Sequence, residues 1–304
     1  MNRALFLFGL VICLSELEAQ DDLLAELEGL EVARKEFVTA TFKGTQVINA
    51  PSNELPGAGV LQFVFQHRFG SLSDDFFYNF LGLDNADVRL GFDYAVNDRL
   101  QIGLGRSSFE KTYDASTKFR ILRQSTGPKA LPLSMTVAAS VFVKSLKWTD
   151  GLPHQFSDRL SYSFHLVISR KFSESFSLAL TPSLVHFNLV DRNDQPNDVV
   201  ALGLGGRYKL NRRISINAEY FPQLNQNSYL DQEQKRVFFN SFSLGFDIET
   251  GGHVFQLFFS NSRGVIAPQY IAQTPGSWKD GDVFFGFNIS RVFTLKKPDL
   301  PAFN

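Results

Sequence analysis

Alternation of apolar and polar residues dominates the chain from Val60 onward. The clearest example runs from Val199 to Phe221, where large apolar residues occupy every second position on both sides of an Asn211-Arg212 pair. A period of two is that of a β-strand, because successive side chains of a strand point to opposite faces. This stretch therefore predicts two strands joined by a tight turn.

Twelve segments of strand length follow one another in the same style. They are residues 60–69, 86–96, 99–109, 115–123, 132–147, 159–170, 176–188, 198–210, 213–222, 236–248, 252–260 and 282–293. Short turns such as Asn97-Asp98 and Thr250-Gly251 alternate with longer loops. One connection on the short-turn side, residues 124–131, is longer than the others. This alternation is typical of a transmembrane up-and-down barrel and is not expected of a soluble sandwich. The predicted fold is all-β: a single antiparallel transmembrane β-barrel of about 12 strands.

The two faces of these segments differ in chemistry. One face collects large apolar and aromatic residues, and we expect it to meet lipid, where a charge at mid-bilayer costs about 2–4 kcal/mol. The other face carries small, polar and charged residues and fits a cramped, polar lumen. The lumen charge candidates are Arg68, Arg89, Asp93, Arg207, Glu219 and Asp247. Two interpretations stay open: pairs across strands that hold the lumen shut, or a ring that selects a substrate.

The ends of the chain differ from the barrel region. Residues 1–19, with Arg3 before the apolar run 4–14 and Ala19 at the end, are typical of a secretory signal, although Leu17 leaves the cleavage position open. Residues 20–57 are acidic and then polar, which fits either a solvated periplasmic leader or a plug that enters the lumen. The barrel is expected over 58–295, and 296–304 form a tail.

Charge and cysteine content remove several classes of function. Loss of Arg3, Glu16 and Glu18 with the signal leaves 29 basic and 29 acidic residues, from totals of 30 and 31. Without a basic excess there is no electrostatic argument for a nucleic-acid partner. The single cysteine, Cys13, leaves with the signal, so no disulfide is expected. No apolar run reaches the roughly 20 residues of a spanning helix.

Aromatic residues lie at strand ends, where ring side chains suit the level of the lipid headgroups. They are Phe69, Phe172, Tyr208, Tyr220 and Phe293. Phe293 closes the last strand as a terminal aromatic does in many outer-membrane proteins, which indicates outer-membrane lipid and the barrel-assembly machinery as partners.

Candidate catalytic or metal-binding chemistry is sparse. The five histidines, at positions 67, 154, 165, 186 and 253, lie on separate segments, so neither a metal site nor a cofactor is expected. Ser163 and His165 share one face about 7 Å apart, which is a loose spacing for a nucleophile and its base. Their parity directs both into the lumen and away from lipid, so we expect a protein that is not an enzyme and keep a barrel lipid hydrolase as a minor alternative.

Several blocks of sequence resemble a known family. LGLDNADVRLGFDYAVNDRLQIGLGRSSFEKTYD at 81–114, LRQSTGP at 122–128, GFDIETGGHVFQLFFSNSRG at 245–264 and GDVFFGFNISRVFTL at 281–295 resemble the uncharacterised outer-membrane β-barrel family of Bacteroidota, a domain of unknown function. The resemblance covers residues 41–295 and implies one barrel in the outer membrane, with no substrate attached. Two of these blocks fall at outer loop ends and supply candidate contact residues. These are Arg106, Glu110, Lys111, Asn261 and Arg263.

Two functions follow as hypotheses. The first is a porin-like outer-membrane barrel that acts as a passive channel, transporter or binding scaffold for a small solute. The alternative is a blocked-lumen structural component of an envelope complex. A soluble lipocalin-like barrel is a further alternative, which detergent partition would distinguish.

Overall fold

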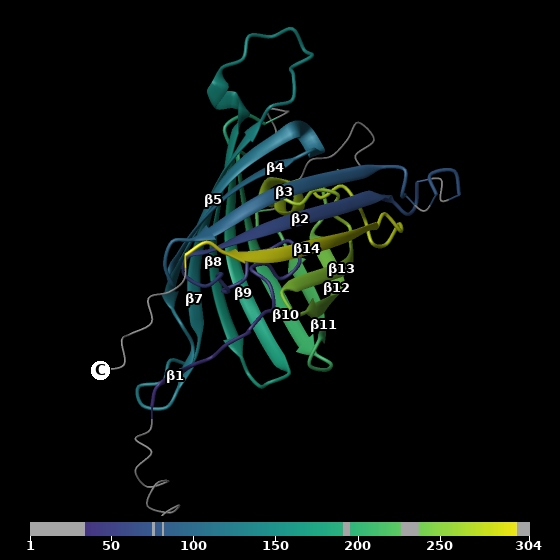
Figure 1. Cartoon of the computed structure of the whole chain (residues 1–304). Helices are drawn as coiled ribbons and strands as arrows, with labels where there is room; N and C mark the ends of the chain where they lie inside the picture. The colour runs from purple at the N-terminus through teal and green to yellow at the C-terminus, as the bar shows by residue number, and fades with distance from the viewer. Residues whose placement is uncertain (1–33, 75–76, 81, 191–194, 226–236, 297–304) are drawn as a thin grey trace, which may run out of the picture.

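The computed structural model describes residues 34–74, 77–80, 82–190, 195–225 and 237–296. Twelve strands form one closed antiparallel barrel (Figure 1), in which each strand pairs with its neighbours along the chain and β14 closes the ring on β2. The strands are β2 (Val60–Ser71), β3 (Ala86–Ala95), β4 (Leu100–Ser107), β5 (Thr112–Leu122), β7 (Ser134–Lys144), β8 (Leu160–Lys171), β9 (Phe176–Phe187), β10 (Asp198–Lys209), β11 (Ile214–Phe221), β12 (Ser241–Thr250), β13 (His253–Ser260) and β14 (Phe284–Thr294). The predicted signal sequence and nearly all of the tail lie outside the described residues.

All twelve predicted strands are confirmed, with differences at their ends. The strand expected from residue 236 begins at Ser241, opposite Phe221, the last residue of β11. Pro222 follows and lacks the N–H that a ladder needs, so the pairing stops there. The strand expected from residue 115 begins at Thr112, because Thr112 pairs with Lys144 at the end of β7.

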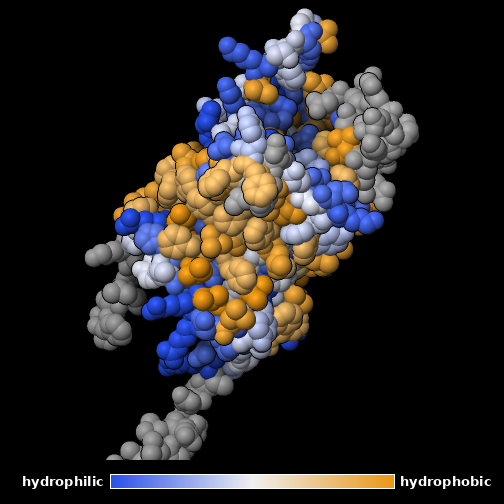
Figure 2. All heavy atoms as spheres, turned by 90° about the vertical axis from the view of Figure 1, so that its right-hand side faces the viewer, coloured by the Kyte–Doolittle hydropathy of each residue, from blue (hydrophilic) through white to orange (hydrophobic). Residues whose placement is uncertain are grey.

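The predicted parity of the wall is confirmed. Outward residues such as Ile102 and Phe164 are exposed, 48% and 50%, while their neighbours Gln101 and Ser163 are buried. Figure 2 shows hydrophobic residues covering the middle of the wall, with hydrophilic residues gathered toward its ends. Because an apolar belt with polar margins matches a bilayer and its headgroups, the wall is suited to lipid.

A second, small sheet lies at the end of the barrel that carries the short turns. It pairs β1 (Glu36–Phe37) with β6 (Ser125–Thr126), which lies in the connection between β5 and β7. The N–H of Val38 donates to the carbonyl of Gln124 at 2.9 Å. The chain passes from this sheet toward the barrel interior (Figure 1).

Residues 45–52 form a tight hairpin inside the barrel, which we call the lumen hairpin. Gln46 and Pro51 pair as an antiparallel bridge, and the N–H of Val47 donates to the carbonyl of Ala50 at 2.8 Å. The residues at its tip, 47–50, are at most 3% exposed. Much of the stretch 41–53, within the segment expected as a leader or a plug, is therefore buried against the barrel wall. Residues 20–33 lie outside the described residues.

The connection between β13 and β14 folds into the barrel from the opposite end. It contains the π-helix η3 (Pro268–Ala272), all five residues of which are buried. Ile271 and Ala272 pack with inward-facing Val185, Val199 and Phe221 in one apolar cluster. The expectation of a uniformly polar lumen is wrong for this region, because a protein loop covers these inward positions and water does not.

Two further single-turn helices lie in the outer connections, η1 (Phe109–Lys111) and η2 (Phe156–Arg159). Within the part of the chain that the structure describes, no helix combines the length and hydropathy of a membrane span.

Candidate functional site in the barrel lumen

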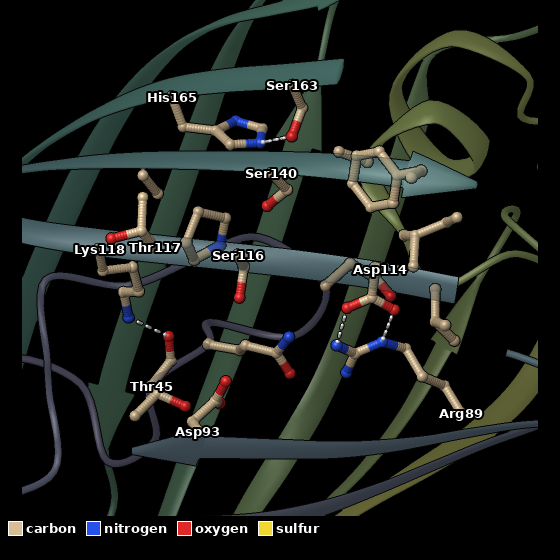
Figure 3. Close-up of a pocket in the computed structure, with 18 of the residues that line it drawn as sticks. Thr45, Arg89, Asp93, Asp114, Ser116, Thr117, Lys118, Ser140, Ser163 and His165 are labelled. Carbon is tan, nitrogen blue, oxygen red and sulfur yellow. Dashed lines mark hydrogen bonds and ion pairs between the residues drawn. The ribbon is translucent and has the colours of Figure 1, made fainter. Parts of the chain in front are cut away.

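A polar cavity remains inside the barrel between the lumen hairpin and the loop that carries η3. Its walls come from β3, β4, β5, β7 and β8, and it offers about 90 Å³ to the centres of water molecules. Figure 3 shows its side chains converging from neighbouring strands. The polar residues of the lining include Arg89, Asp93, Asp114, Ser116, Thr117, Lys118, Ser140, Ser163 and His165.

The strongest ion pair of the cavity joins Arg89 on β3 to Asp114 on β5. The guanidinium contacts both carboxylate oxygens, at 2.9 Å from Nε and 2.5 Å from NH2, and its NH1 donates to Gln66 Oε1 at 2.8 Å. The two side chains are only 11% and 4% exposed. A two-point contact of this kind fixes orientation as well as charge. Arg89 was among the predicted lumen charges, and Asp114 was not.

Glycines on β3 and β4 make room for this pair. A Cβ atom at Gly105 would lie 2.7 Å from both carboxylate oxygens of Asp114, and one at Gly91 would lie 2.7 Å from NH1 of Arg89. Real Cβ atoms essentially never approach so closely. The absence of side chains at these positions therefore permits two charged groups to lie across the sheet inside a narrow barrel.

Lys118 connects the wall to the amino-terminal segment. Its Nζ donates to the carbonyls of Thr45 at 2.9 Å and Glu54 at 2.8 Å, one on each side of the lumen hairpin. Asp93, one of the predicted lumen charges, lines the same cavity. Lys118 was not among the predicted candidates, although the parity of its strand directs it inward.

Glu219 on β11 holds the tip of the lumen hairpin. Its carboxylate accepts backbone N–H bonds from Ile48 at 3.2 Å, Asn49 at 3.0 Å and Ala50 at 3.1 Å. The Asn49 side chain adds a bond of 2.6 Å to the same carboxylate. Arg68 lies on the other side of Asn49, and its NH2 donates to Asn49 Oδ1 at 2.6 Å.

The remaining predicted lumen charges also reach this segment. NH1 of Arg207 donates to the carbonyl of Ala40 at 3.0 Å. Asp247 accepts from Nε2 of Gln256 at 2.9 Å, and that same nitrogen donates to the carbonyl of Val47 at 2.8 Å. Most of the six candidates therefore contact the amino-terminal segment, directly or through one amide, and only Arg89 among them forms a tight pair across the wall. The sequence offered no signal for this arrangement, because residues 41–53 lack strand periodicity.

The predicted outer-loop residues divide into three groups. Arg263 donates to Asp87 at 2.7 Å, and Glu110 pairs with Lys144 at 2.5 Å and accepts from Gln269, so both anchor the loop that enters the barrel. Asn261 is buried and bonds backbone groups on both of its sides. Arg106 faces outward over the ring of Tyr113, and the carbonyl of Lys111 accepts from Ser145. Neither residue takes part in the contacts that anchor the loop between β13 and β14.

The contacts of Asn261 are structural. Its amide nitrogen donates to the carbonyls of Asn240 at 2.9 Å and Gly276 at 2.8 Å, and its oxygen accepts from the N–H of Phe242 at 2.8 Å. These bonds tie the end of β13 to β12 and to the far side of the same loop. The side-chain amide is therefore engaged in stabilising the loop and does not face a solute.

Ser163 and His165 form a hydrogen-bonded pair inside the barrel. Nε2 of His165 lies 3.2 Å from the Ser163 hydroxyl, closer than their strand spacing suggested, and Nδ1 lies 2.9 Å from the Ser183 hydroxyl. In a hydrolase triad a carboxylate occupies the place of Ser183 and stabilises the protonated imidazole. The pair thus has a nucleophile-base geometry with a neutral third member.

Other chemistry at the site is limited. Among the described residues, no group of three His, Cys, Asp or Glu side chains is arranged to hold a metal ion. Tyr270, on η3, borders the cavity, and burial followed by the charge of Glu219 raises the pKa of its phenol well above the usual value. The phenol therefore stays protonated and neutral.

Similar proteins were found at the level of fold and family. No curated protein matches the sequence. Solved structures that match include the NanC porin (8% identity, TM-score 0.48, covering 76% of this chain and 98% of that one) and the KdgM porin (8%, 0.46, 77% and 99%). An outer-membrane channel from Pseudomonas putida F1 matches at 13% identity and a TM-score of 0.45, covering 79% and 97%. Such distant likeness carries no functional argument.

The family model for the membrane-bound β-barrel domain (DUF5777) matches residues 42–293, which is most of the chain and includes the lumen hairpin. That match agrees with the closed ring of twelve strands and with the exposed hydrophobic residues on its outer surface. The chain belongs to this family of membrane-bound β-barrel domains and lies in the outer membrane.

Proposed function

We propose that this barrel is a gated passive channel for small polar solutes, and that the lumen hairpin is its gate. The observation that carries the proposal is the polar cavity between the hairpin and the η3 loop. A barrel with a purely structural role would need no charged, water-accessible surface along five adjacent strands.

The two sides of the lumen differ in chemistry, and this difference supports a path for solutes along one wall. The wall of β9–β11 near the outer mouth is covered by the η3 loop through apolar contacts. The wall of β3–β8 keeps its polar residues open to the cavity. A second cavity of about 70 Å³ lies at the outer loops and shares Ile266 with the first, so the two are neighbours along the barrel.

The size of the cavity supports a closed resting state. The space of about 90 Å³ open to the centres of water molecules holds a small cluster of waters. The buried tip of the lumen hairpin and the buried η3 helix fill neighbouring parts of the lumen. Passage of a solute therefore requires movement of the hairpin or the η3 loop. The hairpin is the better candidate, because its tip is held largely by hydrogen bonds to the wall, whereas the η3 loop packs into the larger apolar cluster.

Single-channel recording in planar bilayers tests the proposal. We expect rare openings from the wild-type protein and a higher open probability from Glu219→Gln, which weakens the attachment of the hairpin tip. Glu174→Gln, at an exposed turn outside the lumen, is the matched control and should behave as wild type. Silence from all three proteins would overturn the channel.

The apolar cluster around η3 favours a second candidate, a structural barrel with a permanently blocked lumen. Ile271 and Ala272 are fully buried against the wall, as in a protein core. That candidate predicts no conductance from any hairpin variant. The assembly machinery and any envelope partner stay predictions in both cases.

We propose no catalysis by Ser163 and His165. The cavity beside them is too small for a lipid, and both side chains are buried inside the barrel. Esterase activity that disappears in Ser163→Ala would contradict this view.

A further inference from the structure

We infer that the lumen site around Glu219 binds the main chain of a polypeptide turn, so that short peptides are the solutes that this channel accepts. The lumen hairpin, which is part of the same chain, then occupies the site to which such a peptide binds. This inference rests on the proposed channel function and adds the chemical class of the solute.

Most hydrogen bonds between the wall and the hairpin with its flanks go to main-chain atoms, although Lys43 in one flank also pairs with Glu249. Glu219 accepts from three consecutive backbone N–H groups at the tip. Backbone carbonyls of the segment accept from side chains on four other strands. The donors are Lys118 to Thr45 and Glu54, Gln256 to Val47, Asn288 to Ile48, and Arg207 to Ala40.

The chemistry of these contacts fits an amide chain. Every peptide unit offers one N–H donor and one carbonyl acceptor, whatever its side chain. The wall supplies the complement, with a carboxylate opposite the N–H groups and amide or cationic donors opposite the carbonyls. Three successive N–H groups that converge on one anion are a property of peptide turns. Carbohydrates have no equivalent set of fixed donors.

Few side chains of the hairpin bond the wall. Asn49 bonds Glu219, Ser243 and Arg68, and Gln46 accepts from Gln66 at 3.2 Å. Val47 packs near Gly205, where a Cβ would lie 3.3 Å from its methyl group. The site thus favours a small polar residue at the centre of the turn and tolerates variation elsewhere.

Departure of the hairpin would remove the hydrogen-bond partners of Glu219 and Lys118 and one partner of Arg68, whose guanidinium also donates to the His67 carbonyl and to Asn288. Glu219 and Arg68 are 1% and 0% exposed, and Lys118 is buried as well. A buried charge that has lost its partner is costly, so an emptied lumen favours any ligand that restores the same bonds. Another peptide turn restores all of them, and this exchange provides a physical basis for selection.

The test keeps the wall intact and loosens the hairpin. The full chain with Asn49→Pro and Ala50→Pro loses two of the three N–H donors to Glu219, because proline has no N–H. Heat modifiability on gels verifies that the barrel is folded. The probe is the capped peptide of residues 45–52, TQVINAPS, and the matched control is the same peptide N-methylated at its Ile, Asn and Ala positions.

We expect the capped peptide to bind the variant, measured by fluorescence polarisation, and to block its single-channel current at a concentration at least tenfold below that of the N-methylated peptide. Addition of Glu219→Gln to the variant should abolish this difference. Equal binding and equal block by the two peptides would overturn the inference while the channel stands. Selective peptide binding with no current in any variant would overturn the channel and leave the peptide site.

Discussion

Glu219 on β11 and Asn49 at the tip of the lumen hairpin are joined by the Asn49 backbone N–H, 3.0 Å from each carboxylate oxygen, and by its side-chain amide at 2.6 Å from Oε1. These residues are separated by 170 positions, so their contact decides whether the amino-terminal segment stays inside the barrel. Because both are buried, water does not compete for these bonds in the closed state.

Glu219→Gln should loosen the hairpin tip while the ring of twelve strands stays closed. The amide offers one acceptor where the carboxylate offers two, and a bond to a charged group contributes about 1.5–3 kcal/mol. We expect backbone amides of residues 48–50 to exchange with deuterium about 100-fold faster, which corresponds to about 3 kcal/mol at 1.4 kcal/mol per factor of ten. Unchanged protection in Glu219→Gln would refute the role of the carboxylate, and Glu174→Gln serves as the control.

The Arg89–Asp114 pair should show strong energetic coupling. Loss of one partner leaves a buried, unpaired charge, so Arg89→Met and Asp114→Leu should each lower the free energy of unfolding by about 3–5 kcal/mol. The double variant should recover much of that loss, since it buries no charge. Denaturant unfolding of the refolded barrel measures all three. Additive losses in the double variant would mean that the two side chains do not depend on each other.

Gly105 should not accept a side chain. The Cβ of Gly105→Ala would meet Asp114 at 2.7 Å, and relief of such crowding costs about 1–3 kcal/mol. Gly206→Ala is the matched control, since its Cβ would meet Leu178 at an ordinary 3.5 Å on the outer wall. Denaturation midpoints of the two variants give the comparison, and equal midpoints would contradict the crowded arrangement around the ion pair.

Two phenylalanines test which side of the wall is packed. Phe221 is 1% exposed inside the barrel, against Tyr270 with ring centroids 5.3 Å apart, whereas Phe119 is 46% exposed toward lipid. Phe221→Ala should cost about 3–5 kcal/mol because it leaves a cavity in the η3 cluster. Phe119→Ala should cost clearly less, since lipid chains can fill the space. Urea titration of the barrel in liposomes measures both, and the reverse order would contradict the assigned faces.

Local sequence pattern predicted the wall of this barrel well. Strand existence, neighbour pairing and parity follow from alternation, because one slip would move Leu104 and Phe164 to the wrong face. Asp114 was missed since the predicted strand began one residue after it, so that it counted as loop. Its pairing with Arg89 depends on a register two strands away, which periodicity does not encode.

The contents of the lumen could not be predicted in the same way. The hairpin tip bonds Glu219 through backbone N–H groups, and any residue except proline carries such a group. The apolar cluster around η3 brings Ile271 against Val199 and Phe221. In the sequence, Val199 and Phe221 lie at strand ends and Ile271 lies in a loop, so local pattern does not predict their contact. Long-range contacts of this kind depend on three-dimensional closure of the barrel.

A reversible disulfide between the hairpin tip and the wall tests the central claim most directly. The side chains of Asn49 and Ser243 are in contact, with Nδ2 3.0 Å from Oγ, so Asn49→Cys/Ser243→Cys is the pair to oxidise. Mass spectrometry without reductant verifies that the disulfide has formed before recording. Single-channel recording of this protein should show silence when oxidised and frequent openings after reduction, because the substituted side chain at position 49 no longer bonds Glu219. Current that is identical before and after reduction would contradict a hairpin that closes the lumen.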